Sequence, residues 1–175
     1  MIEIKHKFTG DVIRVVEADA LAGADLSGAR LEMAELAHKD LTGINLKGAD
    51  LAAADLTRSC LSGANMAGIN LAGANLESAT MPGTVLTAAN LTAANLAGSD
   101  LAGCDLRGAR LVGANLAGAD LSRTDLRGAD LSHGSLEDAN IQGSLFDQTT
   151  RFPELFFDPE KKGAMRVEPT SPQET

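Results

Sequence analysis

Every fifth residue from Leu21 to Phe146 is apolar, and this unbroken period restricts the fold more than any other feature of the sequence. The series holds 26 positions, of which 22 are Leu, and no insertion interrupts it. On an α-helix, five residues advance the chain by about 500°, so these side chains would scatter around the cylinder. In a continuous strand, an odd step places successive leucines on opposite faces. Neither element alone accounts for the period.

The residues around each apolar centre repeat as well. The residue two positions before it is small in 22 of the 26 units, the residue just before it is Asp or Asn in 17, and Gly lies two positions after it in 15. In a short extended segment, the small residue and the Leu point to one side and the Asp or Asn points outward. Gly supplies the positive φ that the third residue of a type II turn needs, and Pro82-Gly83 is a favoured pair for the centre of that turn. The small-residue position has four exceptions: Asp19, Lys39, Ile44 and Ile69.

Regular corners close such a chain into a coil, although the period alone fixes neither the number of sides nor the handedness. On these motifs, the span 19–148 resembles the pentapeptide repeat family. The resemblance implies an all-β fold, a right-handed quadrilateral β-helix with the central Leu and the small residue inside. At four units per coil, the rod would be about 31 Å tall. The interior is then expected to contain Leu26, Leu51, Leu76, Leu96, Leu116 and Leu131.

The ends of the repeat are expected to carry separate segments. Residues 1–18 are predicted as an N-terminal β-hairpin cap, 149–165 as a C-terminal cap with a short helix, and 166–175 as a disordered tail. In the hairpin, pairing Phe8 with Asp11 would place five apolar side chains against the first coil: Ile2, Ile4, Phe8, Ile13 and Val15. The helix would begin at Asp158-Pro159 and end at Gly163.

Three of the five phenylalanines, Phe152, Phe156 and Phe157, cluster after the repeat. One interpretation is a hydrophobic lid on the last coil. The other is a dimerisation surface, because some pentapeptide repeat proteins associate end to end through their C-terminal segment, and an exposed aromatic cluster would be a partner site. A homodimer through this segment therefore remains open.

No constellation of residues indicates catalysis. On a four-sided coil, His38 and His133 would lie five coils apart, roughly 24 Å, and His6 belongs to the hairpin. Cys60 replaces an outward Asp or Asn, whereas Cys104 replaces an inward Ala and should be buried. The repeated Asp residues are expected to bond to turn amides instead of binding calcium. The sequence therefore predicts no enzyme, no cofactor and no metal site.

Charge and hydropathy limit the partners. The formal net charge of −9 and the pI near 4.7 argue against direct nucleic-acid binding, which needs clustered Lys and Arg. No apolar run is long enough to cross a membrane. The N-terminal Met1-Ile2-Glu3-Ile4-Lys5 lacks the pattern of a secretory signal, so a cytoplasmic location is expected.

The leading functional hypothesis is a rigid, non-catalytic scaffold that binds an unidentified protein partner. The alternative is a DNA mimic that binds DNA gyrase, a type II topoisomerase, and modulates quinolone action, as a subgroup of the resembled family does. The distribution of charge argues against mimicry, because Glu77 is the only charged residue in the span 59–99. The uncharged Asn-rich middle is either a docking wall or passive surface.

Overall fold

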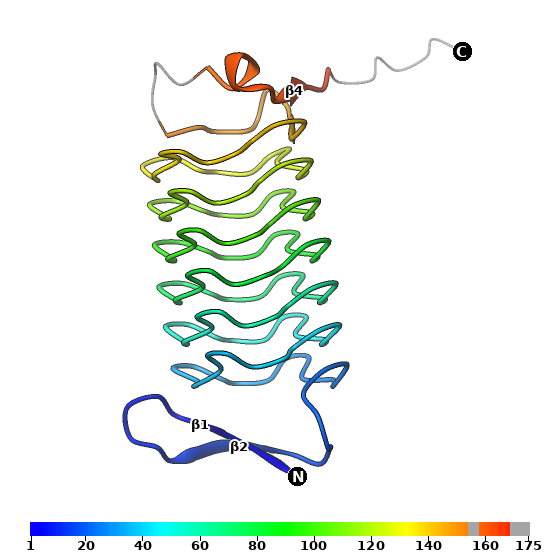
Figure 1. The fold of residues 1–175 in the computed structure, drawn as a ribbon, viewed down its shortest axis with the longest axis vertical. Helices are drawn as coiled ribbons and strands as arrows, with labels where there is room; N and C mark the ends of the chain where they lie inside the picture. Colours follow the sequence, from blue (N-terminus) through cyan, green and yellow to red (C-terminus); the bar gives the residue numbers. More distant parts are fainter. Residues whose placement is uncertain (154–157, 169–175) are drawn as a thin grey trace, which may run out of the picture.

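The computed structural model describes residues 1–153 and 158–168 and shows a tall stack of coils (Figure 1). Parallel β-bridges join residues 20 positions apart, from the pair Asp25 and Asn45 to the pair Asp125 and Leu145. Because 20 residues hold four five-residue units, each coil has four sides. This arrangement agrees with the expected all-β solenoid. We number the sides by the first outward residue on each: side 1 at Asp25, side 2 at Arg30, side 3 at Glu35 and side 4 at Asp40.

A β-turn separates each side from the next. At the corner that contains Pro82 and Gly83, the amide of Thr84 donates to the carbonyl of Met81 at 3.1 Å, and Gly83 has a φ of 66°. Positive φ recurs at every fifth residue from position 23 to position 143. The corners are therefore those that the sequence predicts, with Gly or another residue in the left-handed conformation at each one.

The core is a single column of side chains inside the coils. All six leucines predicted to lie inside are buried, as are Ile44 and Ile69 at the small-residue position. The bridge register stacks Ile44 between Ala24 and Ala64, and Ile69 between Ala49 and Ala89. Each isoleucine therefore has alanines in the coils above and below it, which leaves room for its extra volume. Asp19 and Lys39, the two charged exceptions at the small-residue position, are exposed.

Hydroxyl groups that replace Ala inside the coils bond to the backbone. Ser59 and Ser99 each donate to the carbonyl of the Leu three residues earlier at 2.7 Å, and Thr84 donates to the carbonyl of Leu61 at 2.8 Å. Among the described residues, every buried side-chain nitrogen and oxygen has a hydrogen-bond partner. The interior is therefore both packed and satisfied, as a stable core requires.

The N-terminal hairpin consists of β1 (Ile2–Lys5) and β2 (Val12–Val16), which pair antiparallel. The expected register was wrong, because Ile4 lies opposite Arg14 and a β-bulge follows Ile4. Ile4 and Val16 are consequently the buried residues, while Phe8 is 77% exposed and Val15 is 45% exposed. Ile2 and Ile13 pack against the core as predicted. The one-residue slip turns Val15 outward and Val16 inward, whereas Phe8 lies beyond the end of β1.

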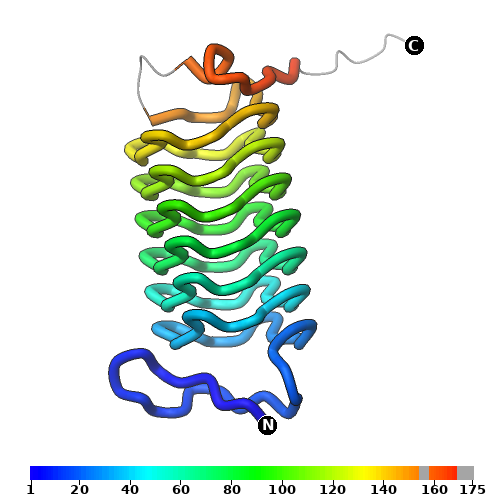
Figure 2. Tube along the Cα trace, in the orientation of Figure 1, coloured from blue at the N-terminus to red at the C-terminus, as the bar shows by residue number. Residues whose placement is uncertain are grey.

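The hairpin joins the first coils through backbone hydrogen bonds. The amide of Glu35 donates to Lys5 O at 2.8 Å, and the amide of Lys7 donates to Met33 O at 2.9 Å. The ammonium of Lys7 also donates to the carbonyl of Ala53. The hairpin consequently lies beneath the first coil, at the N-terminal end of the tube (Figure 2).

At the other end, the ladder continues beyond the repeat. β3 (Leu145–Phe146) pairs in parallel with β4 (Met165–Arg166), again 20 residues apart. One bridge departs from the 20-residue spacing: Asp130 bridges Arg151, which is 21 residues later in the chain. The short helix is a 3₁₀ turn, η1 (Glu160–Lys162), and ends at Gly163. β4 crosses the expected boundary between cap and tail, and residues 169–175 of that tail lie outside the described residues.

Candidate interaction surfaces

The described residues contain no cluster of three or more His, Cys, Asp or Glu side chains able to hold a metal ion. The imidazole of His6 accepts hydrogen bonds from the amides of Phe8 and Thr9, both at 3.3 Å, and so stabilises the hairpin turn. His38 and His133 occupy corners, with φ near 60° in both. In the described part of the chain, no helix is long and apolar enough to cross a bilayer.

The two cysteines lie in opposite environments. Cys104 is buried, its thiol donates to the carbonyl of Met81 at 2.9 Å, and burial raises its pKa to about 12. Cys60 is half-buried, and its sulfur lies 3.3 Å from the hydroxyl of Thr42 and 3.6 Å from that of Ser62. These contacts, with Thr42 the larger cause, lower the pKa of the Cys60 thiol.

Asparagine ladders cover the uncharged middle of sides 2 and 3. On side 2, Asn90 donates to Asn70 Oδ1 at 3.0 Å, and Asn70 donates to Asp50 at 2.9 Å. On side 3, Asn115 donates to Asn95 at 3.2 Å, and Asn95 donates to Asn75 at 3.0 Å. Since these amides already bond to one another and to their own turn amides, less of their hydrogen-bonding capacity remains for a partner.

A charge ladder occupies side 1 in the upper coils. Arg107 forms a bidentate pair with Asp105 at 2.7 and 2.8 Å, and Arg127 forms one with Asp125 at 2.5 and 2.8 Å. Arg107 also lies 3.7 Å from Asp125, in the coil above. The Arg107 guanidinium holds the pKa of Asp105 below its ordinary value. These pairs interrupt the acidic surface on this side.

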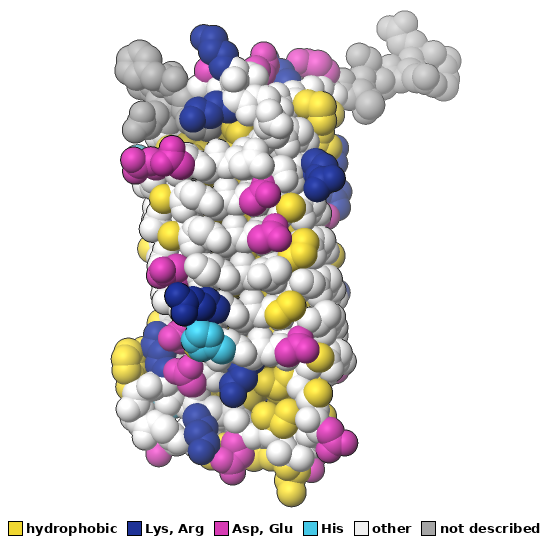
Figure 3. Space-filling model, in the orientation of Figure 1, with side chains coloured by type: hydrophobic (Ala, Val, Ile, Leu, Met, Phe, Trp, Pro, Cys, Tyr) yellow, Lys and Arg dark blue, Asp and Glu magenta, His cyan; other side chains and the backbone are white. Residues whose placement is uncertain are grey.

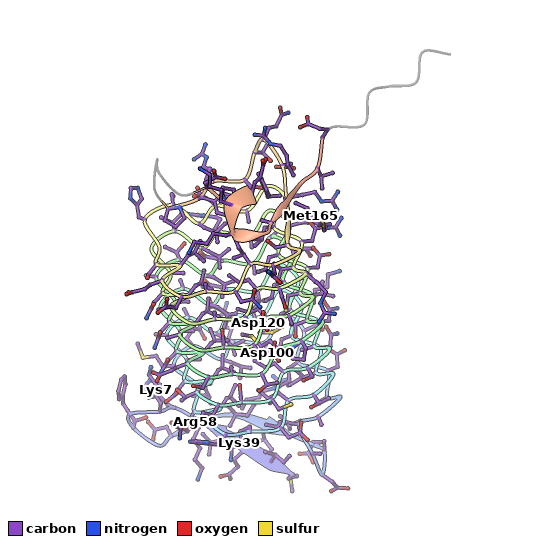
Figure 4. All side chains as sticks on the ribbon, turned by 45° about the horizontal axis from the view of Figure 1, so that its top comes forward. Lys7, Lys39, Arg58, Asp100, Asp120 and Met165 are labelled. Carbon is purple, nitrogen blue, oxygen red and sulfur yellow. The ribbon has the colours of Figure 1, made fainter. Side chains whose placement is uncertain are left out.

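Side 4 carries the acidic residues Asp100 and Asp120 in adjacent coils, stacked as Figure 4 shows. Each carboxylate accepts from the amide two residues later, Asp100 from Ala102 and Asp120 from Ser122. The neighbours of this pair on the same side are Thr80 below and Asn140 above. The acidic run is therefore two coils long.

Of the three clustered phenylalanines, Phe152 is half-buried and stands edge-on to Phe146, with ring centroids 5.5 Å apart. This contact agrees with the lid interpretation for that residue. Phe156 and Phe157 lie outside the described residues, so a dimerisation role for the cluster remains a prediction.

Exposed apolar side chains concentrate at the N-terminal end. Within the described residues, five of the seven large exposed ones belong to the hairpin and the first coil: Met1, Phe8, Val12, Val15 and Met33. Yellow side chains gather accordingly at the lower end in Figure 3. A groove of about 350 Å³ lies between Arg14–Ala18 and Ala24–Leu26. Sequence reasoning missed this surface because it assigned Phe8 and Val15 to the covered face. The only available signal was the stretch Val12–Val16, in which four of the five residues are β-branched.

Comparisons with known proteins match this architecture. The family model for pentapeptide repeats matches, in eight copies, residues 34–68, 69–108 and 109–148. Among solved structures, HetL from the cyanobacterium Nostoc sp. strain PCC 7120, a protein involved in heterocyst differentiation regulation, is similar at 32% identity with a TM-score of 0.60. That alignment covers 72% of this chain and 59% of HetL, so the chain spans less than two thirds of that protein.

A second similar structure is Rfr23 from the cyanobacterium Cyanothece 51142, at 28% identity and a TM-score of 0.52. The alignment covers 75% of this chain and 89% of Rfr23. QnrB1, a plasmid-mediated fluoroquinolone resistance protein, matches at 23% identity and a TM-score of 0.42 over 82% of this chain and 77% of its own. A search of curated proteins finds no match.

Proposed function

Because the chain belongs to the pentapeptide repeat family, we propose that it is a non-catalytic, rigid scaffold whose outer surface binds a protein partner. The observation that carries this proposal is the concentration of exposed apolar side chains on the hairpin and the first coil. Apolar side chains that gather on one part of a soluble protein mark a contact surface, because covering them with a partner releases the water around them.

The interior supports a scaffold role. Leucines and small residues fill the coils, and backbone bonds between coils recur along the length of the stack. The chemically reactive side chains stand apart on different coils. HetL is involved in the regulation of heterocyst differentiation, a role that a binding protein performs without turnover.

We further propose the handedness and the end caps that membership of the family implies. The coil is right-handed, and the hairpin and the C-terminal segment cap the two ends, because strand edges left open invite aggregation. The backbone bonds from Lys5 O to Glu35 and from Met165 N to Ser144 O support this role for both segments. Membership of the family also leads us to propose a homodimer through the C-terminal segment. The solution mass of the protein, measured over a range of concentrations, tests this proposal.

A role as a DNA mimic that binds gyrase requires an acidic stripe along the rod. The acidic pair Asp100 and Asp120 extends over two coils, and on side 1 Arg107 and Arg127 pair with the neighbouring carboxylates. This arrangement favours the general scaffold. A gyrase supercoiling assay with micromolar protein separates the two roles: we expect no inhibition and no protection against quinolones.

The main test compares the wild-type chain with a Val12→Lys, Val15→Lys variant as bait for proteins of its native host. Both side chains are exposed, so the variant should fold. We expect a protein that co-purifies in a fixed ratio with the wild type and is lost from the variant. A control variant, Val85→Lys, alters an exposed valine at mid-height and should retain the partner. Equal recovery with all three baits would contradict the proposal that the N-terminal surface is the contact.

A further inference from the structure

The lowest coil leaves backbone donors open that every higher coil uses. On side 1, the amide of Asn45 donates down to Ala24 O, and the amide of Asn65 donates down to Ile44 O, both at 2.9 Å. Within the described chain, the amide of Asp25 has no such acceptor, although Glu35 on side 3 donates to Lys5 of the hairpin. The hairpin therefore completes the ladder on side 3 and leaves the lower edge of side 1 open.

The groove at the N-terminal end lies beneath that open edge. One wall is Ala24–Leu26 of side 1, and the other is Arg14–Ala18, which includes the end of β2. The sheet contains only β1 and β2, so the second edge of β2 carries no strand among the described residues. Strand edges with free backbone groups bind extended chains by adding a strand.

The lining of the groove defines the chemistry of its occupant. Val16 and Leu26 are buried, while Ala18 and Ala24 are half-buried against the core, so the inner surface is apolar. The charged side chains are Glu17, Asp25 and Arg14, which leaves a net negative charge. Hydrogen bonds to the Asp25 carboxylate, first from Ser27, lower its pKa and keep it ionised.

We propose that this groove binds an extended peptide segment of a partner protein that alternates apolar and basic residues. The inference deepens the proposed scaffold function and rests on it. Along side 1, Ala24 and Leu26 face inward and Asp25 faces outward, so a strand added beside them alternates in the same way. Its apolar side chains contact the half-buried Ala18 and Ala24. Its basic side chains lie near Glu17 and Asp25, and one of its carbonyls accepts from the Asp25 amide.

The test uses an alternating lysine–valine hexapeptide titrated into the full-length, ¹⁵N-labelled protein. We expect saturable shifts in the amide signals of Val16, Glu17 and Asp25, and slower hydrogen exchange at Asp25 in the complex. An alternating glutamate–valine peptide should not bind.

Two variants complete the design. Glu17→Lys, at an exposed position of the groove, should weaken lysine–valine binding about tenfold, whereas the matched charge reversal Asp100→Lys on side 4 should leave it unchanged. Absence of binding at millimolar peptide, or shifts spread over side 4, would overturn the inference. So would concentration-dependent self-association that protects Asp25 without peptide, since a second copy would then occupy the edge. Recovery of a partner protein by a groove-independent surface would leave the scaffold proposal standing and refute only the groove.

Discussion

The corner residues show most clearly how a single position controls this fold. Ten corners hold a residue other than Gly, and each has a φ between 54° and 60°. L-residues pay roughly 1–2 kcal/mol in this conformation, because Cβ approaches the following carbonyl oxygen. Ala93 and Gly73 occupy the same corner in adjacent coils, with φ of 56° and 64°. A Cβ added at Gly73 would meet no heavy atom within 4 Å, so the two positions differ mainly in backbone strain.

These corners predict opposite effects for a matched pair of substitutions. Ala93→Gly should stabilise the protein by about 0.5–1 kcal/mol, because the relief of strain exceeds the entropy that Gly loses on folding. Gly73→Ala should destabilise it by a similar amount. Chemical denaturation of both variants checks this, and a shift of the same sign in both would contradict the account.

The two thiols give a second prediction at this scale. With burial raising the Cys104 pKa to about 12, a thiol reagent at pH 8 should modify Cys60 alone in the native protein and both cysteines after unfolding. Thr42→Val removes the larger cause of the lowered Cys60 pKa and should slow its modification. Native-state labelling of Cys104, read by mass spectrometry, would show that the interior is open to solvent.

At the scale of the element, the sides are held by outward Asp and Asn residues that bond to the amide two positions later. Asp50 accepts from Ala52 at 3.0 Å and Asn90 accepts from Thr92 at 3.3 Å, as the sequence predicts for turn-forming residues. The bonds between coils were not predictable residue by residue. The Asn70–Asn90 pair depends on a register of 20, which the five-residue period leaves open and which only the family resemblance implied.

The Asp105–Arg107 pair predicts the pH response of one such side. The hydrogen bond from Arg107 lowers the folded pKa of Asp105 from 3.8. The ionised carboxylate therefore stabilises the folded protein above that value, and this contribution is lost as the pH falls through the folded pKa. Asp105→Asn should reduce stability at pH 7 but weaken the decline of Tm between pH 5 and 3, and Arg107→Gln should do the same. If Tm declined as steeply in both variants as in the wild type, the Asp105–Arg107 pair would not be a cause of the acid sensitivity.

At the scale of the whole molecule, the repeat carried almost all the predictable information. The apolar centres and small residues identified the interior, including Leu96 and Cys104, because a narrow bore selects by volume. The hairpin register was missed, since the stretch Val12–Val16, β-branched at four of its five positions, satisfies more than one pairing. The groove depends on that register, and for this reason it could not be predicted from the sequence.

A narrow, fully packed bore predicts a large penalty for a cavity at mid-height. Leu96→Ala should cost on the order of 2–5 kcal/mol, because the surrounding coils cannot collapse into the space. Leu96→Met, which nearly conserves volume, should cost less than about 1.5 kcal/mol. Urea denaturation of both variants measures these values, and equal small losses would indicate a loosely filled interior.

Amide hydrogen exchange read residue by residue tests the stacked solenoid most directly. In the middle coils, four amides of each five-residue unit donate to the backbone of the same or a neighbouring coil; the fifth, just after the Leu, bonds at most to a side-chain oxygen. We expect slow exchange interrupted by one fast amide every five residues, with Asp25 and Arg30 fast at the open edge and Asn45 and Asp50 slow. Protection that follows a helical period, or no periodic protection along the repeat, would contradict the solenoid itself.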